Sequence, residues 1–92
     1  MMKAYIFVFD RNYRYDYKKF HEFIKESPHI SNWWRYIQSC YILVSELPAT
    51  KLSREIREVM PKHRFLLSQI HLNNSNGWLP KEAWDWIHKY YD

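Results

Sequence analysis

The chain has 92 residues, enough for one hydrophobic core and too few for a two-domain enzyme, so we expect residues 1–92 to form a single domain. Apolar residues make up 47% and charged residues 26%, the proportions of a folded domain, which exclude a disordered or collagen-like chain. The formal net charge of +4 permits a nucleic-acid partner without requiring one.

Residues 4–9 form a continuous apolar run rich in β-branched and aromatic side chains, which predicts a central strand buried on both faces. A polar turn follows at Asp10. An amphipathic helix is then predicted from an N-cap at Asp16 to Ser27-Pro28, because proline cannot continue a helix. The apolar stripe of this helix consists of Tyr17, Phe20, Phe23 and Ile24.

The stretch from Trp33 to Glu46 is rich in residues that favour strands, but its fourteen residues exceed the usual strand length of about five or six. Gln38 and Ser39 interrupt it in the middle. We therefore predict two strands joined by a tight turn at these two residues, although Gln-Ser is not among the favoured hairpin dipeptides. One long, bent strand is the alternative.

A second amphipathic helix is predicted next, capped by Thr50 or Ser53 and ended by Pro61. Its apolar stripe consists of Leu52, Ile56, Val59 and Met60, and its outward positions are Arg54, Glu55, Arg57 and Glu58.

The rest of the chain predicts a strand over 64–72, a loop over Asn73–Gly77 and a final helix with Pro80 at its first position. This helix has apolar side chains on more than one side, which are Ala83, Trp84, Ile87 and Tyr91 on one and Trp86 and Tyr90 on another. Such a helix tends to be buried by more than its own sheet.

The order of these elements predicts an α+β fold, a ferredoxin-like βαββαβ sandwich with an antiparallel sheet, two helices on one face and an added C-terminal helix. A sheet covered by helices on one face leaves its other face open. Because 20% of the residues are aromatic, we expect that face to pack on something, most simply a second copy of the chain.

No stretch of the sequence is long enough to span a membrane, since the longest apolar run, Tyr36 to Ser45, has ten residues and a spanning helix needs about 20. The N-terminal apolar run leads to Asp10 and Arg11, where a signal peptide would have a small-residue cleavage site. We therefore expect a cytoplasmic protein with no membrane partner.

The histidines, the cysteine and the glycine of this chain do not occur in patterns that predict a metal, catalytic or phosphate-binding site. No two of the five histidines lie four residues apart, which argues against a helical zinc site. Cys40 lies in an apolar segment, as a small core residue does, and as the single cysteine it excludes an internal disulfide and a cysteine-based zinc site. The lack of a glycine-rich loop excludes a P-loop or dinucleotide phosphate cradle.

Asp10 is a candidate metal ligand because it directly follows a buried strand, where its carboxylate is held at the edge of the sheet. Mg²⁺ prefers oxygen ligands and often takes only one or two from protein. The alternative is a turn residue that accepts backbone N–H bonds.

The tryptophans and the basic stretches each allow two interpretations. Trp33-Trp34 and the group of Trp78, Trp84 and Trp86 can stack on bases, or they can form the core or a dimer interface. The basic stretches Arg11–Lys19 and Lys51–Arg57 also contain acids, so each can be an ordinary solvated face or a phosphate-binding surface.

Three segments together resemble a known group of proteins. They are Phe7–Asp10 at the end of the first strand, Trp33–Val44, and Gly77–Pro80 before the tryptophan-bearing final helix. They resemble the small SinR-like proteins of bacteria, a group distantly similar to the CRISPR-associated ferredoxin-like nuclease of the spacer-acquisition machinery and to the VapD toxins. The Trp-Trp and Trp-Leu-Pro signatures are the most specific part of this resemblance.

The resemblance implies a ferredoxin-like fold and a homodimer. In the nuclease relatives, the strand-ending aspartate of each subunit approaches its twin across the dimer axis, and the pair holds one divalent metal ion. Carried over to this chain, Asp10 is the metal ligand and catalytic residue with Mg²⁺ as cofactor, and Ser39 matches the catalytic-site turn residue near it. A metal between two carboxylates relieves their repulsion and supplies a Lewis acid for phosphodiester cleavage.

Two functions are therefore expected. The first is a homodimeric nucleic-acid-associated protein, a candidate metal-dependent endonuclease acting on RNA or DNA. The side chains expected to contact phosphates are Arg11, Arg14, Lys18 and Arg35. The second is a non-catalytic interaction or adaptor module of the same fold, a toxin–antitoxin or defence component whose aromatic surface meets a protein partner. The two differ in whether the chain is an enzyme.

Overall fold

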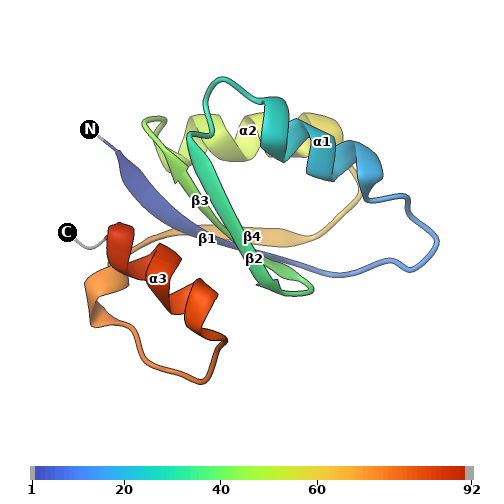
Figure 1. Cartoon of the computed structure of the whole chain (residues 1–92). Helices are drawn as coiled ribbons and strands as arrows, with labels where there is room; N and C mark the ends of the chain where they lie inside the picture. The colour runs from blue at the N-terminus through green and yellow to red at the C-terminus, as the bar shows by residue number, and fades with distance from the viewer. Residues whose placement is uncertain (1, 91–92) are drawn as a thin grey trace.

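The computed structural model describes residues 2–90, which form one antiparallel sheet with helices on both faces (Figure 1). The elements in chain order are β1 (Lys3–Phe9), α1 (Lys18–Glu26), β2 (Asn32–Ile37), β3 (Cys40–Ser45), α2 (Ala49–Val59), β4 (Phe65–Ile70), the 3₁₀-helix η1 (Leu72–Asn74) and α3 (Lys81–Lys89). The strand order is β2-β3-β1-β4. The predicted α+β ferredoxin-like sandwich with an added C-terminal helix is confirmed. Within residues 2–90, no helix is both long and apolar enough to cross a membrane.

The hairpin of β2 and β3 resolves the ambiguity over residues 33–46. β2 ends at Ile37, Gln38 and Ser39 form the turn, and β3 begins at Cys40. The prediction of two strands is therefore confirmed, and the alternative of one long, bent strand is wrong. The pairing shifts in register between Trp34 and Ile37, and an irregularity of this kind increases the local twist of a strand.

β1 is the central strand, because it pairs with β3 on one side and with β4 on the other. Tyr5, Phe7 and Phe9 are buried on one face, whereas the residues between them are only half-buried on the other. The expectation that β1 is buried on both faces is therefore confirmed for one face and only in part for the other. There α1 and α2 pack over the sheet, and the core includes Phe20, Ile24, Leu43, Leu52, Ile56 and Met60.

The opposite face of the sheet is covered in part by α3 (Figure 1). A second, smaller core forms there from Trp34, Ile42, Leu72, Ala83 and Ile87. The face expected to pack on a second copy is thus covered in part by the chain's own helix, while the homodimer stays a prediction. Tyr91, which was expected on an apolar side of this helix, lies outside the described residues.

The first two helices differ from their predicted starts. α1 begins one residue later than predicted, yet the Asp16 carboxylate still accepts the backbone N–H of Lys18 at 3.0 Å. Before α2, Pro48 takes an extended conformation with φ of −67°, and the helix begins directly after it. The predicted caps Thr50 and Ser53 are therefore wrong, because both residues lie inside the helix.

β4 is shorter than the predicted strand over 64–72. The chain leaves the sheet after Ile70 and turns into η1, which buries Leu72 in the second core. The predicted loop is consequently wrong for Asn73 and Asn74, which belong to this 3₁₀-helix.

The segment before α3 exposes one tryptophan completely. Gly77 has a φ of +155°, which residues with a side chain rarely adopt, and the following Trp78 is 99% exposed. Pro80 is the residue before α3 and not its first helical residue. Trp84 and Trp86 are half-buried against the second core, which favours packing over base stacking for these two side chains.

Candidate functional site

Asp10 lies where β1 ends and is bonded to the residue that precedes β4. Its backbone N–H donates to the carbonyl oxygen of Arg64 at 3.0 Å. Nε and Nη2 of Arg64 both lie 2.8 Å from Oδ2 of Asp10, so the guanidinium fork holds one carboxylate oxygen. Both side chains are exposed, and exposed pairs of this kind contribute about 0–1 kcal/mol to stability.

A resident Mg²⁺ does not fit the residues of one chain. Within residues 2–90, no group of three or more histidine, cysteine, aspartate or glutamate side chains is arranged to hold a metal ion. Asp10 offers a single carboxylate, and Arg64 already holds one of its oxygens. The Mg²⁺ site therefore stays a prediction about a dimer in which a second copy supplies another Asp10.

Ser39, the other predicted catalytic residue, lies beside the end of β1, since its carbonyl oxygen accepts the backbone N–H of Phe9 at 3.2 Å. Arg35 is held at the same hairpin, where its Nε and Nη2 donate to the carbonyl oxygen of Gln38 at 3.3 and 3.1 Å. Its guanidinium also lies over the ring of Tyr41, 5.5 Å from the centroid. Arg35 thus supports the hairpin, and a role in binding phosphate stays a prediction.

Arg11 is stacked on aromatic rings. Its guanidinium carbon lies 4.7 Å from the ring centroid of Tyr17 and 5.8 Å from that of Tyr13. Its Nε and Nη1 atoms are buried and have no hydrogen-bond partner among the described residues. Aromatic packing therefore fixes the position of Arg11, and its role in binding phosphate stays a prediction. Arg14 and Lys18, the remaining predicted contacts, are exposed on the β1–α1 loop and in the first turn of α1.

His21 and Tyr41 form a hydrogen-bonded pair between α1 and β3, with His21 Nδ1 3.1 Å from the Tyr41 hydroxyl oxygen. Burial lowers the pKa of His21, and the charges of Lys25 and Arg35 lower it further. Burial raises the pKa of Tyr41, although Arg35 and Arg11 act in the opposite direction. Both side chains are therefore neutral near neutral pH, and their hydrogen bond joins the helix to the sheet.

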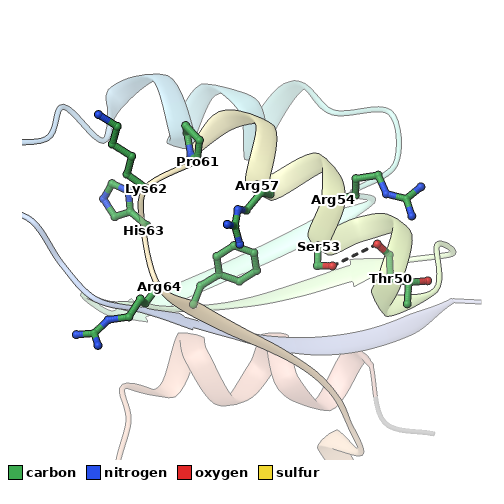
Figure 2. A pocket seen from close by; sticks show the side chains of 9 residues that line it. Thr50, Ser53, Arg54, Arg57, Pro61, Lys62, His63 and Arg64 are labelled. Carbon is green, nitrogen blue, oxygen red and sulfur yellow. Dashed lines mark hydrogen bonds between the residues drawn. The ribbon is translucent and has the colours of Figure 1, made fainter.

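An open cleft of about 760 Å³ lies between α2 and the start of β4 (Figure 2). It is lined by Thr50, Ser53, Arg54, Arg57, Pro61, Lys62, His63, Arg64 and Phe65. Figure 2 shows Arg57 reaching from α2 towards the sheet, with Arg54 and Lys62 on either side of it. Arg64 lies where β4 begins and is directed away from α2.

Among the cations that line this cleft, Arg64 is paired with Asp10, but the others have no carboxylate partner in the described chain. Among the residues that line it in the described chain, none is aspartate or glutamate. Within residues 2–90, ion pairs join Arg64 to Asp10 and Lys81 to Asp85, and His29 Nδ1 lies 2.8 Å from Oε2 of Glu55. The exposed side chains of Arg54, Arg57 and Lys62 thus have no carboxylate partner in that part of the chain. Charges of one sign around a concave surface focus the electric field there and attract anions.

The sequence interpretation missed this cleft, although part of the signal was present. Thr50, Ser53, Arg54 and Arg57 have the spacing i, i+3, i+4, i+7, which places them on one face of a helix. A charge count over the stretch Lys51–Arg57 does not show that the arginines lie on one face, because the stretch also includes Glu55. Glu55 pairs with His29 and does not line the cleft. The other wall comes from the start of β4, and no local pattern joins the two walls.

Comparison with known proteins gives no relative, since no protein-family model, no curated protein and no solved structure matches this chain. The resemblance to the SinR-like proteins therefore stays a prediction. The geometry of the α2–β4 cleft is the basis for assigning a function.

Proposed function

We propose that this chain binds nucleic acid through the phosphate backbone, in the cleft between α2 and β4. The observation that carries the proposal is the set of exposed cations, Arg54, Arg57 and Lys62, around a concave surface with no carboxylate partner among residues 2–90. Phosphate matches this set because arginine offers a planar fork to two of its oxygens, and lysine adds a compact charge.

A polyanion suits this surface better than a single small anion does. Sites for small molecules are enclosed and mostly apolar, whereas this cleft is open, and its cations are spread over α2 and the segment before β4. A polymer with a regular row of phosphates can neutralise several separated cations together. The release of counterions from the polymer then adds to the affinity with each contact.

Cleavage is a separate step from binding. Asp10, the predicted metal ligand, is bonded to Arg64, which lines the cleft, so the two features lie side by side. One chain brings a single carboxylate to this place, and a second would have to come from another copy. We therefore assign binding to the single chain and confine metal-dependent cleavage to a dimer that joins two Asp10 side chains.

Fluorescence anisotropy with labelled RNA and DNA oligonucleotides tests the proposal. The double variant Arg54→Gln/Arg57→Gln removes two cleft charges, and we expect its affinity to fall at least about tenfold. A hydrogen bond to a charged group contributes about 1.5–3 kcal/mol, and 1.4 kcal/mol corresponds to a factor of ten. The matched control Lys81→Gln/Lys89→Gln removes two charges on α3, on the opposite face of the sheet (Figure 1), and should bind as the wild type does.

Equal losses in the two double variants would show that net charge alone drives binding, and would contradict a site in the cleft. Failure of the wild-type protein to bind any oligonucleotide would refute the proposal. It would move the assignment to the non-catalytic interaction module, for which Trp78 is the most exposed large apolar side chain in the described chain.

A further inference from the structure

The basic surface extends from the α2–β4 cleft to the loop that joins β1 to α1. A second hollow of about 150 Å³ is lined by Asp10, Arg11, Asn12, Lys62, His63 and Arg64. The last three of these residues also line the cleft, so the two hollows adjoin. Asn12 leads directly to Tyr13, whose side chain is 84% exposed. An exposed aromatic ring therefore lies at the end of the basic surface.

The exposed ring of Tyr13 has a contact with the guanidinium of Arg11. The guanidinium of Arg11 is stacked on the Tyr13 ring at 5.8 Å and on the Tyr17 ring at 4.7 Å. Tyr17 is fixed in turn, because its hydroxyl oxygen accepts the backbone N–H of Asn12 at 2.8 Å and lies 2.8 Å from Nε2 of His63. A continuous chain of contacts thus links the exposed ring to the wall of the cleft.

Arg11 acts in this chain as a stacking cation. Its Nε and Nη1 atoms are buried, and no hydrogen-bond acceptor within residues 2–90 meets them. The attraction between a guanidinium and the ring faces offsets part of the lost hydration of these atoms. The loop therefore uses Arg11 to orient Tyr13, which leaves Lys62 and the cleft arginines to meet phosphates.

Resting on the proposed nucleic-acid function, we infer that the site takes single-stranded nucleic acid, with one base stacked on Tyr13 and the neighbouring phosphates on the cations of the cleft. A basic groove beside exposed aromatic rings is the arrangement that binds single strands, because every base has a face that can stack. In a duplex the faces of each base are already covered by its neighbours. Tyr13 thus adds affinity for a single strand and none for a duplex.

Affinities for three probes test this inference. The probes are a labelled single-stranded oligonucleotide, its duplex, and inorganic polyphosphate, which has the charges without the bases. Tyr13→Ala is expected to lose about 5- to 150-fold in affinity for the single strand, the range given by base–aromatic stacking, and to keep its affinity for the other two probes. Tyr13→Phe keeps the ring and is the matched control, which should bind all three probes as the wild type does.

The stacking inference and the proposed function fail in different ways. Unchanged single-strand affinity in Tyr13→Ala, with a loss in Arg54→Gln/Arg57→Gln, would overturn stacking and leave phosphate binding in place. A parallel loss of all three probes in Tyr13→Ala would also overturn it, since only the single strand offers free base faces. A wild-type protein that binds none of the probes would refute both.

Discussion

The cleft beside α2 differs from the α3 face of the sheet in which side chains it exposes. The cleft exposes cations, whereas the α3 face buries tryptophans fully or in part. On the α3 face three tryptophans contribute to the second core, since Trp34 is 3% exposed and both Trp84 and Trp86 pack against it. Beside α2, Arg54 and Arg57 stay exposed around a concave surface. The tryptophans that could have stacked on bases mainly stabilise the fold, and the charges that could have been ordinary surface residues form the candidate site.

The two most exposed aromatic side chains, Trp78 and Tyr13, sharpen this contrast. Trp78 is fully exposed, but it precedes α3 and lines neither of the two basic hollows. Tyr13 is almost as exposed, and it is stacked on Arg11 next to a basic hollow. Exposure alone therefore does not identify an aromatic ring that binds nucleic acid. Neighbouring cations identify it, because they attract a polyanion to within reach of the ring.

The largest effect is expected in the second core, from Trp34→Ala. This side chain is buried between the sheet and α3, and its Nε1 donates to the carbonyl oxygen of Ala83 at 3.4 Å. We expect the free energy of unfolding, measured by urea denaturation, to fall by about 3–5 kcal/mol. Trp78→Ala is the matched control and should change it by less than about 0.5 kcal/mol. Similar losses in the two variants would contradict the claim that Trp34 stabilises the fold and Trp78 does not.

Arg57→Glu should give the opposite result, a loss of binding without a loss of stability. Arg57 is exposed and reaches into the cleft (Figure 2), so its replacement breaks no contact of the core. We expect at least about tenfold weaker oligonucleotide binding, and a free energy of unfolding within about 0.5 kcal/mol of the wild type. A large drop in stability with little change in affinity would reverse the comparison between the two faces.

Asp10→Ala should have a smaller effect, and in the direction of tighter binding. The variant removes a negative charge next to the cleft and releases Arg64 from its ion pair. We expect a roughly twofold to fivefold gain in affinity, since an exposed ion pair contributes up to about 1 kcal/mol. The endonuclease interpretation instead predicts that Mg²⁺-dependent cleavage is lost in this variant.

Asp85→Ala is the control for this experiment, because Asp85 forms a comparable exposed ion pair with Lys81 on α3. Its affinity should equal that of the wild type. A gain of similar size in both variants would show that overall charge, and not the release of Arg64, is responsible.

The smallest effect concerns the hydrogen bond between His21 and Tyr41 and the pH dependence of stability. Burial lowers the pKa of His21 in the folded protein below its ordinary value of 6.5, so below about pH 6.5 the unfolded chain binds more protons at this residue. This contribution to stability is complete above pH 6.5 and is lost as the pH falls towards the folded pKa. His21→Gln should therefore show a shallower loss of stability between pH 7 and pH 5 in urea denaturation. A slope equal to that of the wild type would rule out a pKa shift at His21.

Local patterns predicted most of the fold, because each element shows its own period of apolar residues. The β2–β3 hairpin followed from a run too long for one strand with Gln38-Ser39 at its centre. The position of α3 did not follow, since the pattern of that helix shows two apolar sides without showing which surface covers them. Its packing on the open face of the sheet depends on Leu72, which a 3₁₀ turn carries into the second core.

The candidate site was predicted less well, because its parts are far apart in the sequence. Asp10 was identified from its place after a strand, but its partner Arg64 lies 54 residues away. The helical face of Arg54 and Arg57 is visible in the spacing alone. Only the folded chain places that face opposite Lys62 and shows that no described acid lines the cleft.

The salt dependence of binding tests the central claim, phosphate recognition in the α2–β4 cleft, most directly. For single strands the logarithm of the binding constant falls with the logarithm of the salt concentration with a slope of about −0.7 per neutralised phosphate. Contacts from Arg54, Arg57 and Lys62 predict a slope of about −2 for the wild type and of about −0.7 for Arg54→Gln/Arg57→Gln. The same slope in both proteins would contradict the claim, because the two arginines would then take no part in neutralising the phosphates.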